Sequence, residues 1–140
     1  MHTALLRHQH HEIASIVNEM RKHLLAPQRM TRATADGLHA SMETLSGRIS
    51  AHLMIEDRGL YPKLEAATIP SAGPTGARFA MEMIPIANNW AAFKVKWSSG
   101  EKIHADAKIF VDECATFFHV LSHRIDAEEK ELYPLADALP

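Results

Sequence analysis

The stretch HLMIEDRGLYP at residues 52–62 is echoed by EEKELYP at residues 128–134, so an acidic pair precedes Leu-Tyr-Pro at the same spacing twice. Glu56 and Glu128 each lie four residues before the leucine of their copy. On a helix with about 3.6 residues per turn, this spacing places carboxylate and leucine on one face. The repeat therefore predicts two helix ends that each bury an acid, and a buried acid needs a metal ion, an arginine or a proton as partner.

The composition limits the size and the class of the protein. The chain has 140 residues, 46% of them hydrophobic and 6% aromatic, which predicts one domain over residues 1–140. The net charge is -2 and acids and bases are mixed along the chain, so no surface is suited to nucleic acid or an anionic membrane. The ten histidines make metal binding or pH sensitivity worth testing.

The expected location follows from what the sequence lacks. A single cysteine, Cys114, rules out an internal disulfide framework and fits a reducing compartment. The N-terminus has no long apolar run typical of a signal peptide, and no stretch approaches the roughly 18 apolar residues of a membrane-spanning helix. We therefore expect a soluble cytoplasmic protein, and a homodimer is left open.

Apolar residues recur three and four positions apart along most of the chain, a pattern typical of amphipathic helices. The expected helices are a first from Leu6 to Leu24 ended by Pro27, a second from about Thr34 to Leu60 ended by Pro62, a third from Phe79 to Trp97 that contains Pro85, and a fourth from Ile103 to Glu128. Residues 68–76 are rich in glycine and proline and predict a loop. Ser98 and Glu101 have capping-box spacing before the fourth helix. No strand pattern competes, so the fold class is all-α, an antiparallel up-down-up-down four-helix bundle, and the interior of such bundles is a usual place for metal sites.

Several polar residues share the apolar stripes of these helices. His10 lies four residues after Leu6 on the first stripe, and Glu82 shares the inner face of the third helix. His52 and Glu56 are four apart on the second helix, so both can reach a metal beside the helix axis. On the fourth helix the inner seam runs through Arg124 and Glu128.

These residues together resemble the hemerythrin-like (HHE cation-binding) family over essentially the whole chain. The resemblance rests on His10 followed by Ile13, on the His52-x-x-x-Glu56 segment before Leu-Tyr-Pro, and on Glu128-Glu129 before the second Leu-Tyr-Pro. It implies a four-helix fold and a non-haem di-iron centre held by histidines from all four helices and two bridging carboxylates. It also implies oxygen binding, iron or oxygen sensing, or peroxide or nitric oxide chemistry. His10 and His52 match nitrogen ligands of the family, and Glu56 and Glu128 match its bridging acids.

The sequence departs from the family pattern on two helices. The third helix contains no histidine, so Glu82 is the substitute ligand expected there. Arg124 stands where the second repeat should carry the counterpart of His52, and a guanidinium does not bind a cation. His123 is adjacent but points away from the core on a regular helix, so it becomes a ligand only if a local bulge turns it inward.

Two functions remain open. The first is an iron-binding protein that senses or handles oxygen, peroxide or nitric oxide through an altered centre with one or two ions, without any need for turnover. The second is a metal-free structural or interaction bundle, in which Arg124 bridges Glu56 and Glu128 while a proton or an imidazolium balances the remaining charge. An enzyme ranks third, because it needs two metals with open positions.

Some remaining residues are expected to be structural or exposed. His11 is the fallback ligand if the register of His10 is wrong. Tyr61 and Tyr133 precede prolines at helix ends and are expected to pack as plugs over the end of the bundle. The residues expected at the surface are His2, His8, His39, His104, His119, Asp57 and Glu129.

Overall fold

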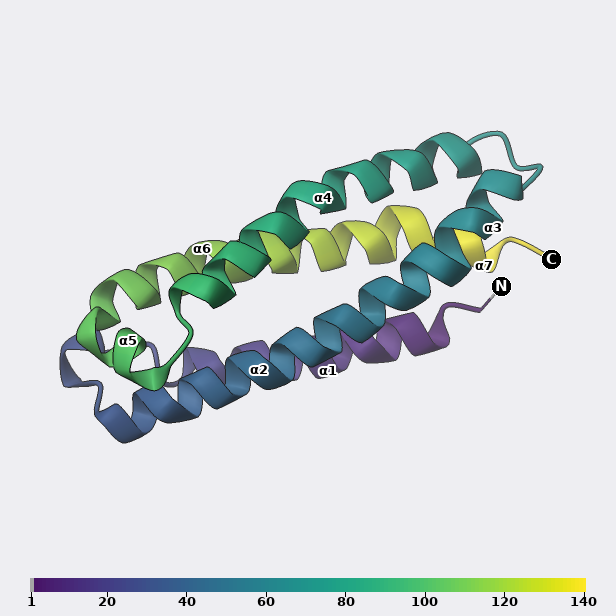
Figure 1. Cartoon of the computed structure of the whole chain (residues 1–140). Coiled ribbons are helices and arrows are strands. Elements are labelled where there is room, and N and C mark those ends of the chain that lie inside the picture. Colours follow the sequence, from purple (N-terminus) through teal and green to yellow (C-terminus); the bar gives the residue numbers. More distant parts are fainter. Residues whose placement is uncertain (1) are drawn as a thin grey trace.

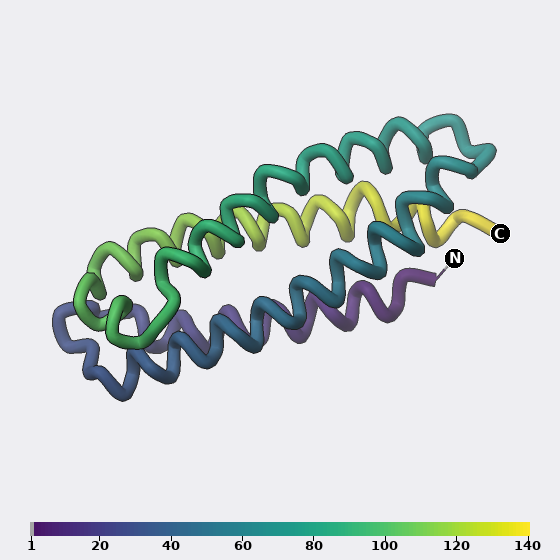
Figure 2. Tube along the Cα trace, in the orientation of Figure 1, coloured from purple at the N-terminus to yellow at the C-terminus, as the bar shows by residue number. Residues whose placement is uncertain are grey.

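Four long helices form the body of the protein in a computed structural model that describes residues 2–140. They are α1 (Ala4–Arg21), α2 (Arg32–Ile55), α4 (Ala72–Lys96) and α6 (Ala107–Ala127). They run alternately in opposite directions, and both termini lie at one end of the bundle (Figures 1 and 2). No strand occurs in the described range. The predicted antiparallel four-helix bundle is thereby confirmed.

Shorter elements connect and close the long helices. They are a 3-10 turn η1 (Pro27–Arg29), the helices α3 (Tyr61–Ala66), α5 (Gly100–Ala105) and α7 (Tyr133–Asp137), and two π-helical turns, η2 (Glu56–Leu60) and η3 (Glu128–Leu132). The two π turns fall on the two copies of the sequence repeat. A π turn holds one more residue than an α-helical turn, and such turns are frequent at functional sites.

The predicted end of the second helix at Pro62 is wrong. The chain stays helical through η2 and α3 to Ala66, and within η2 the Tyr61 N–H donates to the carbonyl of Glu56, five residues back. Pro62 lies in the first turn of α3, where a missing N–H costs little. The wider π turn therefore lets the helix pass a proline that the sequence pattern reads as a stop.

Three other predictions about helix boundaries also differ from the structure. The loop expected at residues 68–76 is shorter, because α4 already begins at Ala72. A side chain at Gly76 would meet the Leu64 side chain at 3.2 Å, so this glycine lets α3 and α4 approach closely.

The cap before the fourth helix is Ser99 rather than Ser98, since the Ser99 hydroxyl accepts from the Lys102 N–H. The expected fourth helix is also divided, with α5 and α6 meeting at Asp106.

The core consists of two apolar clusters. The larger cluster fills the middle of the bundle and the end where α5 lies, and the smaller closes the end that holds both termini. The larger cluster contains six aromatic side chains, two of which, Trp90 and Phe117, stack with 4.6 Å between ring centroids. The smaller cluster includes Leu60, Leu132 and Tyr133 from the two copies of the repeat.

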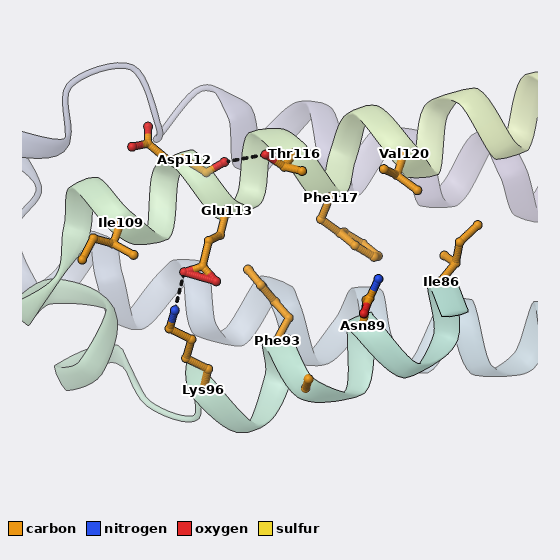
Figure 3. A pocket seen from close by; sticks show the side chains of 11 residues that line it. Ile86, Asn89, Phe93, Lys96, Ile109, Asp112, Glu113, Thr116, Phe117 and Val120 are labelled. Carbon is orange, nitrogen blue, oxygen red and sulfur yellow. Dashed lines mark hydrogen bonds and ion pairs between the residues drawn. The ribbon is translucent and has the colours of Figure 1, made fainter. Parts of the chain in front are cut away.

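A groove of about 540 Å³ runs between α4 and α6 (Figure 3). Phe93 and Phe117 lie along it, and a 2.7 Å ion pair joins Lys96 of α4 to Glu113 of α6. In the part of the chain that is described, no helix combines the length and apolar character needed to cross a membrane.

The N-terminal residues are tied to the C-terminal helix by Thr3 and Asp137. The Thr3 N–H and hydroxyl both donate to Asp137 Oδ1, at 3.0 and 2.8 Å, and Arg7 Nη2 donates to the same carboxylate at 3.4 Å. Burial raises the pKa of Asp137, but these hydrogen bonds and the charge of Arg7 bring it below its ordinary value. The ionised carboxylate is therefore the form that stabilises this end of the bundle.

We expect Asp137→Asn to lower the free energy of unfolding by about 1 kcal/mol near neutral pH. Because the folded-state pKa lies below the unfolded value of 3.8, this contribution is present above that value and is lost as the pH falls through the folded pKa. Urea unfolding at neutral and at acidic pH measures the difference between variant and wild type. A difference that stays constant down to the lowest pH would contradict this assignment, and Asp126→Asn, at an exposed pair with Lys130, is the control.

Candidate metal centre

The two copies of the repeat bring their acids together inside the bundle. Glu56 opens the π turn after α2 and Glu128 opens the π turn after α6, and both residues are buried. In each copy the leucine four residues later is also fully buried. The sequence expectation that acid and leucine share an inward face is correct at both ends.

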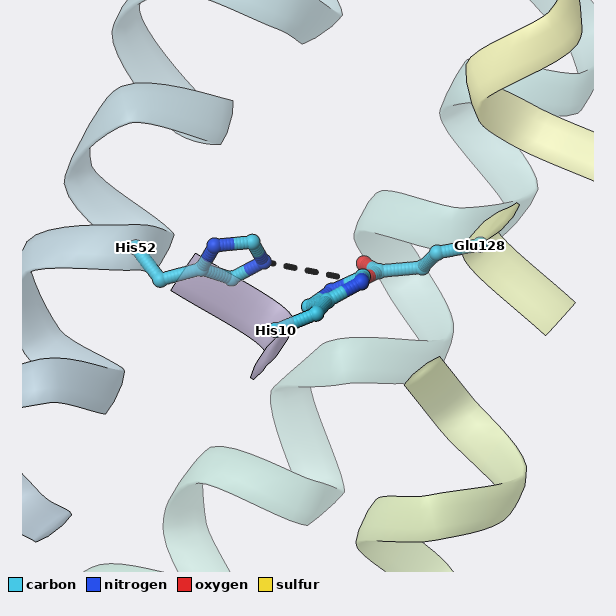
Figure 4. Close-up of side chains that lie close together, drawn as sticks. All are labelled: His10, His52 and Glu128. Carbon is cyan, nitrogen blue, oxygen red and sulfur yellow. Dashed lines mark hydrogen bonds and ion pairs between the residues drawn. The ribbon is translucent and has the colours of Figure 1, made fainter. Parts of the chain in front are cut away.

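Three donor atoms converge at this point, from His10 on α1, His52 on α2 and Glu128 on η3 (Figure 4). Their ligand atoms all lie within 4.8 Å of one another, and all three residues are buried. His10 Nε2 is 2.8 Å from Glu128 Oε1, and His52 Nε2 is 3.6 Å from the same oxygen. An imidazole lone pair and a carboxylate oxygen can approach this closely only when a proton or a cation lies between them.

The opposite nitrogen of each imidazole has its own partner. His10 Nδ1 lies 3.2 Å from Glu129 Oε2, and His52 Nδ1 lies 2.9 Å from Gln9 Oε1. Both partners accept, so each Nδ1 carries a hydrogen and each Nε2 is directed to the centre. Orienting partners of this kind are the usual support of histidine ligands to metals. Glu129 was expected to be solvated, but it is half-buried and performs this role for His10.

Tyr133 is the central residue that the sequence analysis did not place in the site. Its side chain is fully buried, and its hydroxyl oxygen lies 3.1 Å from His10 Nε2, 3.2 Å from His52 Nε2, 3.0 Å from Glu56 Oε2 and 3.3 Å from Glu128 Oε1. The ring stacks on His10 with centroids 5.2 Å apart. Tyr133 does close the bundle end as expected, but its polar group points at the predicted ligands. The signal that could have identified it is its fixed place in the repeat, one residue after a buried leucine.

Glu56 lies at the edge of the converging donors. Its Oε2 is 3.5 Å from His52 Nε2 and accepts from the Tyr133 hydroxyl, whereas Oε1 is buried without a hydrogen-bond partner among the described residues. The pKa of Glu56 lies above its ordinary value, because the effect of burial exceeds the opposing effect of the contact with His52. An orphaned buried carboxylate oxygen is a group that a cation or a water would satisfy.

Arg124 points into the bundle, as its place in the heptad seam predicts. Its Nε donates to Glu128 Oε2 at 3.2 Å, its Nη2 donates to the Tyr61 hydroxyl at 3.1 Å, and its guanidinium lies 4.8 Å over the Phe79 ring. The expectation that Arg124 bridges Glu56 and Glu128 is wrong, because it reaches Glu128 alone and takes Tyr61 as its second partner. Arg124 Nη1 is buried and has no partner within residues 2–140.

Two predicted ligands lie outside the centre. Glu82 is not on the inner face of α4: half of its side chain is exposed and it pairs with Arg78 at 3.1 Å. α4 turns Phe79 inward, and Glu82, three residues later, falls on the flank of the helix. His123 is exposed as well, because the π turn begins five residues after it, at Glu128, too late to rotate it inward. Both residues line a groove on the outer side of Arg124.

The register of α1 is settled by burial. His10 is 2% exposed, whereas His11 faces solvent, so the fallback ligand is not needed. The residues His2, His8, His104, His119 and Asp57 are exposed as expected, and His39 is partly exposed beside Glu43.

The ionisable groups of the centre shift one another's pKa values strongly. Burial lowers the pKa of His52, but hydrogen bonds and charge from Glu128 and Glu56 more than offset this and raise it to about 9. Burial raises the pKa of Glu128, yet the hydrogen bonds of His10 and His52 and the charge of Arg124 leave it well below its ordinary value. Without a metal, the imidazolium of His52 and the guanidinium of Arg124 therefore lie beside one acid that keeps its charge, Glu128, and a second, Glu56, that favours its protonated form.

The donor set fits one cation. Two imidazole nitrogens and a carboxylate oxygen are ligands that iron, zinc and related transition metals accept, and the orphaned Glu56 Oε1 supplies a further oxygen nearby. A cavity of about 20 Å³ adjoins these residues and Arg124, and the rest of its lining is apolar, including Ile13, Ile49 and Leu121. Such a space holds one water-sized molecule.

A helical bundle with buried imidazole and carboxylate donors defines a class, the cation-binding four-helix proteins. A family model described as the hemerythrin HHE cation binding domain matches residues 1–136, and the chain belongs to that family. Comparison with curated proteins and with solved structures returned no match for the chain. The family is a cation-binding one, and His10, His52 and Glu128 form a cluster whose ligand atoms lie close enough together to hold a metal ion.

Proposed function

We propose that the protein binds a single iron ion through His10, His52 and Glu128 and uses it to sense or handle dioxygen, peroxide or nitric oxide. The observation that carries this proposal is the 2.8 Å approach of His10 Nε2 to Glu128 Oε1, with His52 Nε2 directed to the same oxygen. The Nδ1 partners of both imidazoles hold the rings in the orientation that a metal requires.

One ion, rather than two, is supported by the use of the Glu128 carboxylate. A bridging carboxylate gives one oxygen to each metal, but here Oε2 accepts from the buried guanidinium of Arg124. The residues that would complete a second position, Glu82 and His123, both face solvent. Arg124 therefore supplies, as a fixed positive charge, part of what a second cation would contribute.

The volume of the cavity beside the proposed ligands limits what can bind there to a small molecule. About 20 Å³ beside His10, His52 and Glu128 leaves room for one molecule near the size of water, not for an organic substrate. Arg124 lines this cavity and retains an unpartnered Nη1 in the described structure, so it can donate to an anionic or polar ligand. Iron, when bound, supplies Lewis acidity and a change of oxidation state. The apolar side chains that line the cavity exclude bulk water, which strengthens the electrostatic interactions within it.

Thermal unfolding with and without a chelator tests metal binding. Since iron binds only the folded chain, we expect the iron-loaded protein to be more stable by about 3 kcal/mol at a hundredfold excess over Kd, and to melt at a higher temperature than the chelator-treated protein. His52→Ala should remove this difference, and His11→Ala, at the exposed neighbour of His10, should retain it. Identical melting of both preparations, with no iron in either, would refute the proposal.

A second function, a metal-free structural or interaction bundle, has one observation in its favour. The Tyr133 hydroxyl and the Arg124 guanidinium both donate to Glu128, and the raised pKa of His52 favours an imidazolium beside it, so the buried carboxylate has partners without a metal. If this is the working state, metal analysis will find no iron after expression in iron-rich medium, and Glu56→Gln will alter stability without any loss of a metal signal.

A further inference from the structure

We propose that the phenol oxygen of Tyr133 is the fourth protein donor to the cation, bound as a phenolate beside His10, His52 and Glu128. This inference rests on the proposed metal binding. It adds to the histidine and carboxylate donors a ligand type that the sequence comparison did not assign to this site.

The separations between the donor atoms carry the argument. Donors about 2.0–2.1 Å from one metal in tetrahedral arrangement lie roughly 3.4 Å from one another. The Tyr133 oxygen lies 3.1 Å from His10 Nε2, 3.2 Å from His52 Nε2 and 3.3 Å from Glu128 Oε1. The edges from Glu128 Oε1 to His10 and His52 are 2.8 and 3.6 Å. Five of the six separations of a four-donor site therefore lie between 2.8 and 3.6 Å, close to the tetrahedral value.

The placement of Tyr133 is not that of an ordinary core tyrosine. A buried hydroxyl usually satisfies itself with one or two partners, whereas this oxygen stands within hydrogen-bond distance of four groups that are all potential metal ligands. The ring is fixed by stacking on His10 and by Arg7, whose guanidinium lies 5.3 Å over the ring. The oxygen is therefore held at the centre rather than free to turn away.

The proton balance is local. In the absence of a metal the Tyr133 hydroxyl donates to Glu56 Oε2 at 3.0 Å. With a cation bound, Tyr133 would hold it through an oxygen that has given up its proton, and Glu56 Oε2, in its ionised form, would be the acceptor already in hydrogen-bond contact with that oxygen. Tyrosinate is an established ligand of ferric iron in proteins, and a bound cation favours the deprotonated form of its ligand.

Tyr61 provides a matched control. It occupies the same place in the other copy of the repeat, but its hydroxyl accepts from Arg124 Nη2 and does not belong to the converging donors. Tyr61→Phe and Tyr133→Phe therefore remove the same atom from equivalent positions, one outside the proposed metal ligands and one within them.

The experiment is visible absorption and resonance Raman spectroscopy of the ferric protein. We expect the wild type and Tyr61→Phe to show a phenolate-to-iron charge-transfer band, with tyrosine ring modes enhanced on excitation in that band. Tyr133→Phe should lose both signals and bind ferric iron about tenfold or more weakly. Circular dichroism verifies that the variant is folded, and the Raman modes of the wild type test the ligand without any variant.

The outcomes separate this inference from the proposed function. Iron bound by the wild type without tyrosine modes would overturn the phenolate ligand and leave metal binding intact. Retention of the band in Tyr133→Phe would also overturn it, because another tyrosine would then be the ligand. Failure of the wild type to bind any iron would overturn both.

Discussion

Replacing Glu128 with glutamine is expected to abolish tight iron binding and to lower the stability of the metal-free protein by about 3 kcal/mol or more. The carboxylate is 3% exposed and contacts both His10 and Arg124, so its neutral analogue leaves the buried guanidinium without a counter-charge. The amide also lacks the anionic oxygen that the cation requires. The loss of iron and the loss of stability have one cause, because the Glu128 carboxylate is the negative charge that both the cation and Arg124 require.

Iron content and urea unfolding measure the two effects of Glu128→Gln. Glu82→Gln is the control, since Glu82 is the same residue type in a half-exposed pair with Arg78 and should change neither quantity. A Glu128→Gln protein that keeps its iron would contradict the ligand assignment. A variant that loses iron but keeps full stability would contradict the account of Arg124.

Replacing Arg124 with histidine is expected to raise the iron capacity from one ion per chain toward two. The substitution frees Glu128 Oε2 from the guanidinium and places an imidazole four residues before Glu128, the spacing that His52 and Glu56 have in the first repeat. Glu56 Oε1, which has no partner in the described residues, is available as a further oxygen. The added ligand and the removed charge both favour a second cation.

The control for this prediction is Arg124→Met, which removes the charge but offers no nitrogen donor. We expect it to lose the Arg124–Glu128 pair, to be less stable as the metal-free protein, and to remain at one ion. Iron analysis of the three proteins distinguishes the contributions. A capacity of one in Arg124→His would show that the side-chain positions on α4 and α6, not the guanidinium, limit the centre.

The inward-facing residues were largely predictable from the sequence. His10, His52, Glu56, Arg124 and Glu128 all lie on apolar stripes of long helices, and the structure buries each of them. A period of 3.6 residues is enough to assign these faces because α1, α2 and α6 are regular up to the acids.

Glu82 and His123 show where periodicity is insufficient. Glu82 lies three residues after the buried Phe79, a spacing that covers both the core face and its flank, and a side chain on the flank with a salt-bridge partner turns outward. A π-helical bulge does follow α6, but it begins at Glu128, after His123. Sequence can indicate that a π turn is needed without giving the residue where it begins.

Tyr133 escaped prediction for a different reason. The helical period predicts which side chains face the core along regular α-helices. Tyr133 instead reaches the centre from α7, after η3, whose π turn adds one residue and so changes which side chains that follow face inward. The same π turn in the other copy directs Tyr61 to Arg124 instead. The two copies share local geometry and differ in partner, because the surrounding residues of α1 and α6 differ.

The most direct test of the central claim is anomalous X-ray scattering at the iron edge from crystals of the iron-loaded protein. The account predicts one peak per chain, bounded by His10 Nε2, His52 Nε2 and Glu128 Oε1. No peak at these atoms would contradict it and favour the metal-free bundle. Two peaks bridged by Glu128, with Arg124 displaced, would contradict the single-cation centre.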